Sequence, residues 1–95
     1  MLYIRFEWDE NKNRANVKKH KISFEEAKTV FHDENARLIP DPNHSIDEER
    51  FILLGFSYKA KLLVVVHAYR EQDELIRIIS ARKATKTESN YYFRK

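Results

Sequence analysis

The segment LIRIISARKATKTE (residues 75–88) decides the fold, because it joins a buried strand to a basic helix. Its first half is rich in isoleucine, a β-branched residue that packs well on a sheet. Thr85 and Glu88 have the T-x-x-E spacing of a capping box, in which the two side chains satisfy backbone donors at the start of a helix. A sheet that leads directly into Arg82 and Lys83 is suited to binding polyanions.

Two further apolar segments precede this strand and complete a meander. We expect strands at residues 48–56, 62–69 and 75–81. Only five residues separate each strand from the next, which is too few for a crossover helix. The three strands should therefore run antiparallel.

The N-terminal part is expected to supply two helices. Asp9 is a candidate N-cap for the first helix, and Ser23 and Glu26 have the spacing of a second capping box. The expected elements are a strand at residues 2–8, helices at 10–20 and 24–32, and an edge strand at 37–40. The order β-α-α-β-β-β-β-α predicts an α+β fold with a largely antiparallel sheet in a single domain, residues 1–95.

Side-chain alternation along the meander predicts two different sheet faces. The first face is expected to form a core beneath the first two helices, with Ile52, Leu54, Val64, Val66, Ile76 and Ile78. The second face is expected to be partly open and crossed by the last helix, with Phe51, Leu53, Leu63, Val65, Ile79, Glu49, His67, Tyr69 and Arg77. A cationic groove could lie along this second face.

The charges are distributed unevenly, although the net charge is only +3. Residues 9–24 carry five Lys or Arg against two acids, and residues 82–95 carry five against one. Residues 25–50 carry three against eight. Basic ends and an acidic middle indicate one surface for phosphates and another for a basic partner or for self-association, with solvated helix faces as the alternative.

The composition excludes several classes of protein. The absence of cysteine excludes disulfides, thiolate metal sites and cysteine nucleophiles, and it fits the reducing cytoplasm. One glycine cannot build a phosphate-cradling loop, so we expect no nucleotide cofactor. No signal peptide or apolar run of roughly 20 residues occurs, so no membrane association is expected. The less favoured possibility is a metal site, drawn from His44 with Asp41 or Asp47, or from His67 with Glu49.

Cleavage of RNA without a metal fits the remaining charged residues. The ribose 2′-hydroxyl is itself the nucleophile, so the protein has only to move protons and stabilise the phosphorane charge. The candidate proton-transfer groups on the open face are His67 and Glu49. The candidate charge stabilisers and RNA contacts are Arg70, Arg77, Arg82, Lys61, Tyr91 and Arg94. Structural roles stay open: His67 could be a packed strand residue, and Glu49 could pair with Arg77.

The chain resembles the BrnT family, toxins of bacterial type II toxin-antitoxin pairs, in three segments: FEWDENKNRANVKKHKISFEEAKTVFHD (6–33), DPNHSIDEERFILLG (41–55) and IRIISARKATKTESNYY (76–92). The resemblance implies a RelE-like fold and a ribonuclease that arrests translation. It also implies a BrnA-like ribbon-helix-helix antitoxin, through which the pair would bind operator DNA. The positions that match the family's motifs are His44, Ser45, Glu49, Arg50, Arg70, Arg77, Ser80, Arg82 and Lys83.

These motif positions extend the candidate site. His44 joins the catalytic candidates, and Arg50 and Lys83 join the RNA-binding candidates. Two other functions stay open on sequence alone. The same basic groove could bind RNA or the ribosome without cleaving it, or the chain could be an inactive toxin homologue that acts as antitoxin partner and co-repressor.

Overall fold

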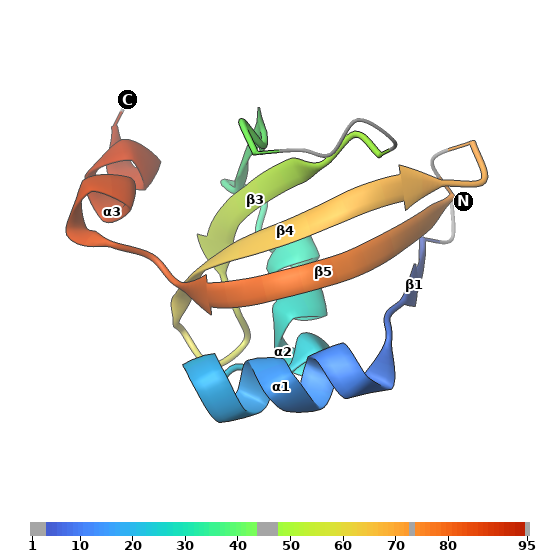
Figure 1. Cartoon of the computed structure of the whole chain (residues 1–95). Coiled ribbons are helices and arrows are strands. Elements are labelled where there is room, and N and C mark those ends of the chain that lie inside the picture. The colour runs from blue at the N-terminus through green and yellow to red at the C-terminus, as the bar shows by residue number, and fades with distance from the viewer. Residues whose placement is uncertain (1–3, 44–47, 73, 95) are drawn as a thin grey trace.

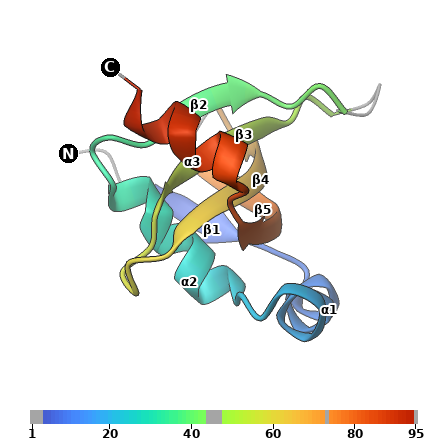
Figure 2. The ribbon, with the colours of Figure 1, turned by 90° about the vertical axis from the view of Figure 1, so that its left-hand side faces the viewer.

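The computed structural model describes residues 4–43, 48–72 and 74–94. Its elements are β1 (Arg5–Glu7), α1 (Glu10–His20), α2 (Phe24–Lys28), the 3₁₀ helix η1 (Thr29–His32), β2 (Arg37–Pro40), β3 (Phe51–Phe56), β4 (Leu62–Arg70), β5 (Leu75–Lys83) and α3 (Lys86–Phe93). The strands form a five-stranded sheet in the order β1-β5-β4-β3-β2. Helices α1 and α2 lie on one face of this sheet, and α3 lies on the other (Figure 1, Figure 2). Within the described residues, no helix has the length and apolar character needed to span a bilayer.

The strand pairing confirms a mixed α+β fold with a largely antiparallel sheet. The pairs β2–β3, β3–β4 and β4–β5 are antiparallel, as the short connections between β3, β4 and β5 predicted. Strand β1 pairs parallel with β5 and places Glu7 opposite Arg77. This one parallel pair brings the N-terminal strand beside the first residues of β5.

Each α-helix begins at a polar cap, because the first backbone N–H groups of a helix have no partner within it. The Asp9 carboxylate accepts hydrogen bonds from the first turn of α1, and Thr85 and Glu88 form the complete capping box of α3. The second capping box forms only by half. Ser23 accepts the Glu26 N–H, but the Glu26 carboxylate instead accepts a hydrogen bond from Ser57 at 2.7 Å.

The elements form where they were expected, but several of them begin or end at different residues. The expected helix 24–32 is divided into α2 and the tighter η1, and β1 covers only residues 5–7 of the expected strand 2–8, of which residues 2 and 3 lie outside the description. Strand β3 begins at Phe51 rather than at residue 48. Strand β5 continues to Lys83, so Arg82 belongs to the sheet.

The assignment of the helices to the two sheet faces is reversed for the residues of β3 and β4 relative to the prediction. Helices α1 and α2 cover the face that contains Leu53 and Val65. Helix α3 packs on the opposite face, here called the α3 face, against Leu54 and Val64. The side chains on both faces are apolar. Alternation therefore shows which residues share a face, but it does not show which helix covers that face. The predicted core beneath the first two helices is therefore wrong for Ile52, Leu54 and Val64, whereas Ile76 and Ile78 do lie in that core.

A bulge in the β4–β5 pairing also changes which charged residues share a face. The register shifts between Val66 and His67, and the pairing skips Ile79. One extra residue inverts the alternation of the strand beyond it. As a result Arg77 lies on the α3 face with Arg82, rather than on the face of His67.

The single glycine has a packing role. A Cβ atom on Gly55 would lie 2.9 Å from both Val30 Cγ1 and Ala36 Cβ, closer than real Cβ atoms approach. Strand β3 can therefore pass beneath η1 at this position only without a side chain.

Candidate active site

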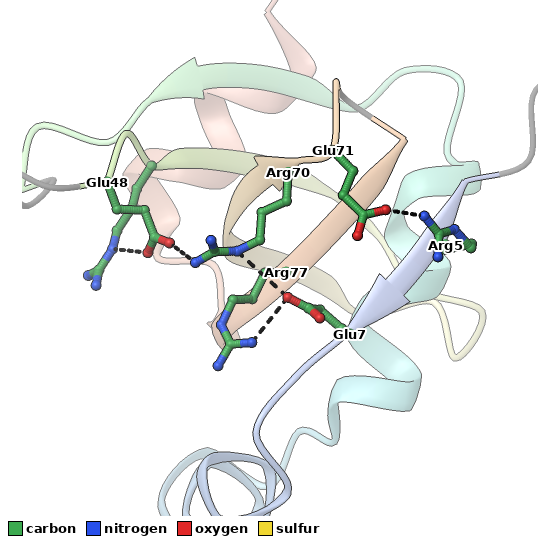
Figure 3. Close-up of polar contacts among 7 residues, drawn as sticks. Arg5, Glu7, Glu48, Arg70, Glu71 and Arg77 are labelled. Atoms are coloured by element: carbon green, nitrogen blue, oxygen red, sulfur yellow. Dashed lines mark hydrogen bonds and ion pairs between the residues drawn. The ribbon is translucent and has the colours of Figure 1, made fainter.

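Five side chains on the α3 face form a continuous chain of ion pairs, here called the arginine–glutamate network (Figure 3). Arg77 Nη1 donates to Glu7 Oε2 at 3.1 Å, and Arg70 Nε lies 3.6 Å from the same oxygen. Arg70 also donates to Glu48 through Nη2, and Glu48 Oε1 lies 3.7 Å from Arg50 Nε. Strands β1, β4 and β5 and the segment before β3 thus each contribute a charge.

The network is accessible and carries one more positive than negative charge. The side chains of Arg50, Arg70 and Arg77 are 30, 43 and 31 % exposed. A guanidinium has five donors in a planar fork, so donors remain for a phosphate after one carboxylate contact. The Nε of Arg50 is buried and makes no hydrogen bond within the described residues. An arrangement of this kind can bind the phosphodiester of a nucleic acid.

A second arginine site lies at the other end of β5, where Arg82 and Glu88 form two hydrogen bonds of 2.8 Å. The hydrogen bonds from Arg82 lower the pKa of Glu88 to about 2 and raise the pKa of Arg82. Glu88 also accepts the Thr85 N–H at 2.8 Å. Arg82 therefore fixes the start of α3, and its guanidinium is already engaged by a carboxylate. The neighbouring Lys83 is exposed.

A groove of about 440 Å³ runs between α3 and the sheet. It is lined by Ile39, Ile52, Leu54, Val64, Thr87, Glu88, Tyr91 and Arg94. Two guanidinium groups lie over the Tyr91 ring, Arg37 at 4.9 Å and Arg94 at 5.5 Å from its centroid. The groove joins an apolar floor to an aromatic ring with cationic neighbours, which is a surface on which a nucleobase can stack. Lys61, half-buried, precedes β4 and lies outside this lining.

His67 does not lie on the exposed face that the alternation predicted. It is fully buried beneath η1, with its ring centroid 4.9 Å from that of Phe31. Its Nδ1 lies 3.1 Å from the Val65 carbonyl oxygen and its Nε2 lies 3.2 Å from the Tyr69 hydroxyl. Burial lowers the pKa of His67, which favours a neutral ring. The position of His67 therefore supports the structural role, that of a packed strand residue.

The remaining candidates divide into three groups. Glu49 is exposed, and the pair expected between Glu49 and Arg77 is wrong, because Arg77 contacts Glu7. Ser80 is half-buried on β5. His44, Ser45 and Asp47 lie outside the described residues. Among the residues that the structure describes, no group of three or more His, Cys, Asp or Glu could hold a metal ion.

Sequence reasoning missed Glu7 and Glu48 as parts of the site. Glu7 reaches the site only because β1 pairs with β5, and nothing in the local pattern of residues 2–8 indicates that partner. Glu48 has an acidic neighbour at the adjacent position, and the pattern alone gave Glu49 the preference. No signal in the sequence pairs either acid with these arginines, because the arrangement depends on the strand order and on the bulge in β5.

Comparison with known proteins adds a family to this geometry. Residues 8–88 match the family model described as the ribonuclease toxin BrnT of type II toxin-antitoxin systems. The fold is similar to that in the crystal structure of the Brucella abortus ribonuclease toxin BrnT, with a TM-score of 0.64 and 23 % sequence identity over 90 % of this chain and 100 % of that one. A search among curated proteins gave no match. Because the family model covers most of its length, the chain belongs to the BrnT family of ribonuclease toxins of type II toxin-antitoxin systems.

Proposed function

We propose that this toxin is an endoribonuclease that cleaves RNA without a metal ion and thereby arrests translation. The observation that supports this most is the arginine–glutamate network, in which three accessible guanidinium groups meet on one sheet face. We also propose a RelE-like relationship for the fold and treat residues 1–95 as one toxin domain. Translated RNA is found in the bacterial cytoplasm, which is where this activity would act.

The chemistry needs few protein groups because RNA supplies its own nucleophile. The 2′-oxygen attacks the adjacent phosphorus, and the bond from phosphorus to the 5′-oxygen breaks. Arg70 and Arg77 would bind the phosphate oxygens and stabilise the charge that develops on them, which is commonly the largest catalytic contribution. The products would be a 2′,3′-cyclic phosphate, or the 3′-phosphate formed from it, and a 5′-hydroxyl.

The protein partner of a type II toxin is its antitoxin. We propose an antitoxin of the BrnA type, a ribbon-helix-helix protein that carries the complex to operator DNA. Acidic side chains of that antitoxin would compete with RNA for the arginines of the network, because carboxylate and phosphate use the same donors. Operator DNA would then be bound by the complex rather than by the toxin alone.

One observation favours a second candidate, an inhibitor that binds RNA or the ribosome without cutting. The buried His67 cannot transfer protons at the surface, so this imidazole gives no support to catalysis. An inactive homologue that acts as co-repressor would likewise bind antitoxin without cutting RNA. RNA cleavage by the purified toxin separates the endoribonuclease from these two functions.

The test uses purified toxin freed of antitoxin, with single-stranded RNA in EDTA. We expect discrete cleavage, with end mapping that finds cyclic or 3′-phosphate termini. Cleavage that EDTA abolishes and magnesium restores would contradict metal independence. Cleavage of DNA at a comparable rate would contradict the 2′-hydroxyl mechanism, because DNA lacks that group.

A further inference from the structure

We propose that Glu7 is the general base that removes the proton from the attacking 2′-hydroxyl. This inference rests on the ribonuclease function proposed above and assigns the proton acceptor for it. Glu7 lies at the end of β1, and its side chain is 38 % exposed on the α3 face. A carboxylate at a solvent-accessible phosphate site has the position that this role requires.

The two oxygens of Glu7 have different surroundings. Both arginine contacts, from Arg77 Nη1 at 3.1 Å and from Arg70 Nε at 3.6 Å, fall on Oε2. Among the hydrogen bonds of the described residues, none falls on Oε1. One oxygen therefore fixes the carboxylate in place, and the other has a lone pair available for a proton.

The arginines that hold Glu7 are the ones expected to hold the scissile phosphate. The 2′-hydroxyl and the phosphate are attached to neighbouring carbons of one ribose, so a group that binds the phosphate also places the hydroxyl nearby. Arg70 and Arg77 would contact carboxylate and phosphate at the same time through different donors. This geometry brings the base, nucleophile and phosphorus together before the reaction starts.

The other carboxylates are less suited to the role. Glu48 also contacts Arg70, but an arginine lies against each of its oxygens, Arg70 at Oε2 and Arg50 Nε at 3.7 Å from Oε1. Both oxygens of Glu88 are occupied by Arg82, and one of them also accepts the Thr85 N–H. Glu71 pairs with Arg5 at the exposed edge. Glu7 itself can be reached from solvent, because its side chain is 38 % exposed.

The proposed step balances as follows. Glu7 accepts the proton of the 2′-hydroxyl while the 2′-oxygen forms a bond to phosphorus. The bond between phosphorus and the 5′-oxygen breaks, and the leaving 5′-oxygen takes a proton from water. The protonated Glu7 then returns its proton to solvent, and no oxidant, reductant or other reactant is consumed.

The experiment measures cleavage of a labelled RNA transcript in EDTA by wild-type protein and by Glu7→Gln. We expect the variant to be slower by about a hundredfold or more, because a positioned general base contributes roughly 10²- to 10⁴-fold. Its affinity for the same RNA with a 2′-deoxy nucleotide at the cut site should stay within about threefold. Glu71→Gln is the matched control, since Glu71 also forms an ion pair with an arginine on this edge, and it should cleave at the wild-type rate.

The outcomes separate the base from the overall function. If wild-type protein leaves RNA intact, the ribonuclease function fails and this assignment fails with it. If wild-type protein cuts and folded Glu7→Gln cuts at a similar rate, only the assignment of Glu7 is wrong. Should Glu7→Gln melt below the assay temperature, Glu7→Asp decides: its carboxylate is withdrawn by one methylene, so we expect at least a tenfold loss, and a wild-type rate would overturn the proposal.

Discussion

His67 occupies an aromatic cage on the face covered by η1. Its ring meets those of Phe31 and Tyr69 nearly edge to face, with centroids 4.9 and 5.1 Å away. Both ring nitrogens have partners, the Val65 carbonyl oxygen and the Tyr69 hydroxyl. The fold therefore holds a neutral imidazole, and burial lowers the pKa of His67 below its ordinary value of 6.5.

This burial predicts a loss of stability in mild acid. The unfolded chain binds a proton at His67 as the pH falls through 6.5, whereas the folded chain resists it until a lower pH. The stabilising contribution is thus fully present above pH 6.5 and is lost as the pH falls below it, by at most about 1.4 kcal/mol per pH unit. Denaturant melts at pH 7.0 and 5.5 should show a larger drop for wild type than for His67→Gln. An equal drop in the two proteins would show that His67 is not the group responsible.

Helix α3 is attached to the sheet by polar contacts at both ends. At its start, Arg82 and Glu88 form their paired hydrogen bonds. Near its end, the Tyr92 hydroxyl donates to Asp33 at 2.7 Å, and Arg37 donates to the Tyr92 carbonyl oxygen at 3.2 Å. Burial and the contact with Asp33 raise the pKa of Tyr92 to about 12, so this hydroxyl keeps its proton over the physiological range.

The cap of α3 gives a prediction for stability. Thr85→Ala removes the hydroxyl that accepts the Glu88 N–H, and a lost cap of this kind costs about 1 kcal/mol of unfolding free energy. The exposed Thr87, one residue into the first turn of the helix, is the control, and Thr87→Ala should change the free energy by less than half as much. Urea unfolding of the three proteins measures both values. Equal stability of Thr85→Ala and wild type would mean that the capping box does not anchor the helix.

Elements with strong local signals could be predicted from the sequence. The caps at Asp9 and Thr85 mark helix starts, and connections of five residues force antiparallel pairing. Prediction from the sequence failed where a residue with a local signal had a second possible partner elsewhere in the chain. The spacing of Ser23 and Glu26 suits a capping box, but a distant hydroxyl on Ser57 competes for the same carboxylate.

At the scale of the whole molecule, the site depends on two features that local pattern does not encode. One is the bulge at Ile79, which moves Arg77 to the face of Arg82. The other is the parallel pairing of β1, which adds Glu7. The sequence motif could therefore identify these arginines as candidates. Which face they share and which carboxylates they contact could be seen only in the tertiary structure.

The position of the network predicts how the antitoxin acts. If acidic side chains of the antitoxin bind these arginines, Arg77→Glu should weaken antitoxin binding at least tenfold and also abolish toxicity, because like charges would face each other. Arg5→Glu reverses a charge outside the network and should affect both much less. Calorimetric titration of each variant with antitoxin measures the first effect. Unchanged binding by Arg77→Glu would place the antitoxin on another surface.

The most direct test of the arginine-centred site is RNA cleavage in EDTA by three purified variants, each confirmed as folded by a thermal melt. Arg70→Ala and Arg77→Ala should each be slower than wild type by about a hundredfold or more, since losing one stabilising donor typically costs that much. Arg5→Ala removes a more exposed ion pair outside the network and should keep the wild-type rate. Folded Arg70→Ala and Arg77→Ala proteins that cut RNA as fast as wild type would contradict the account, and the site would then have to be sought around Arg50.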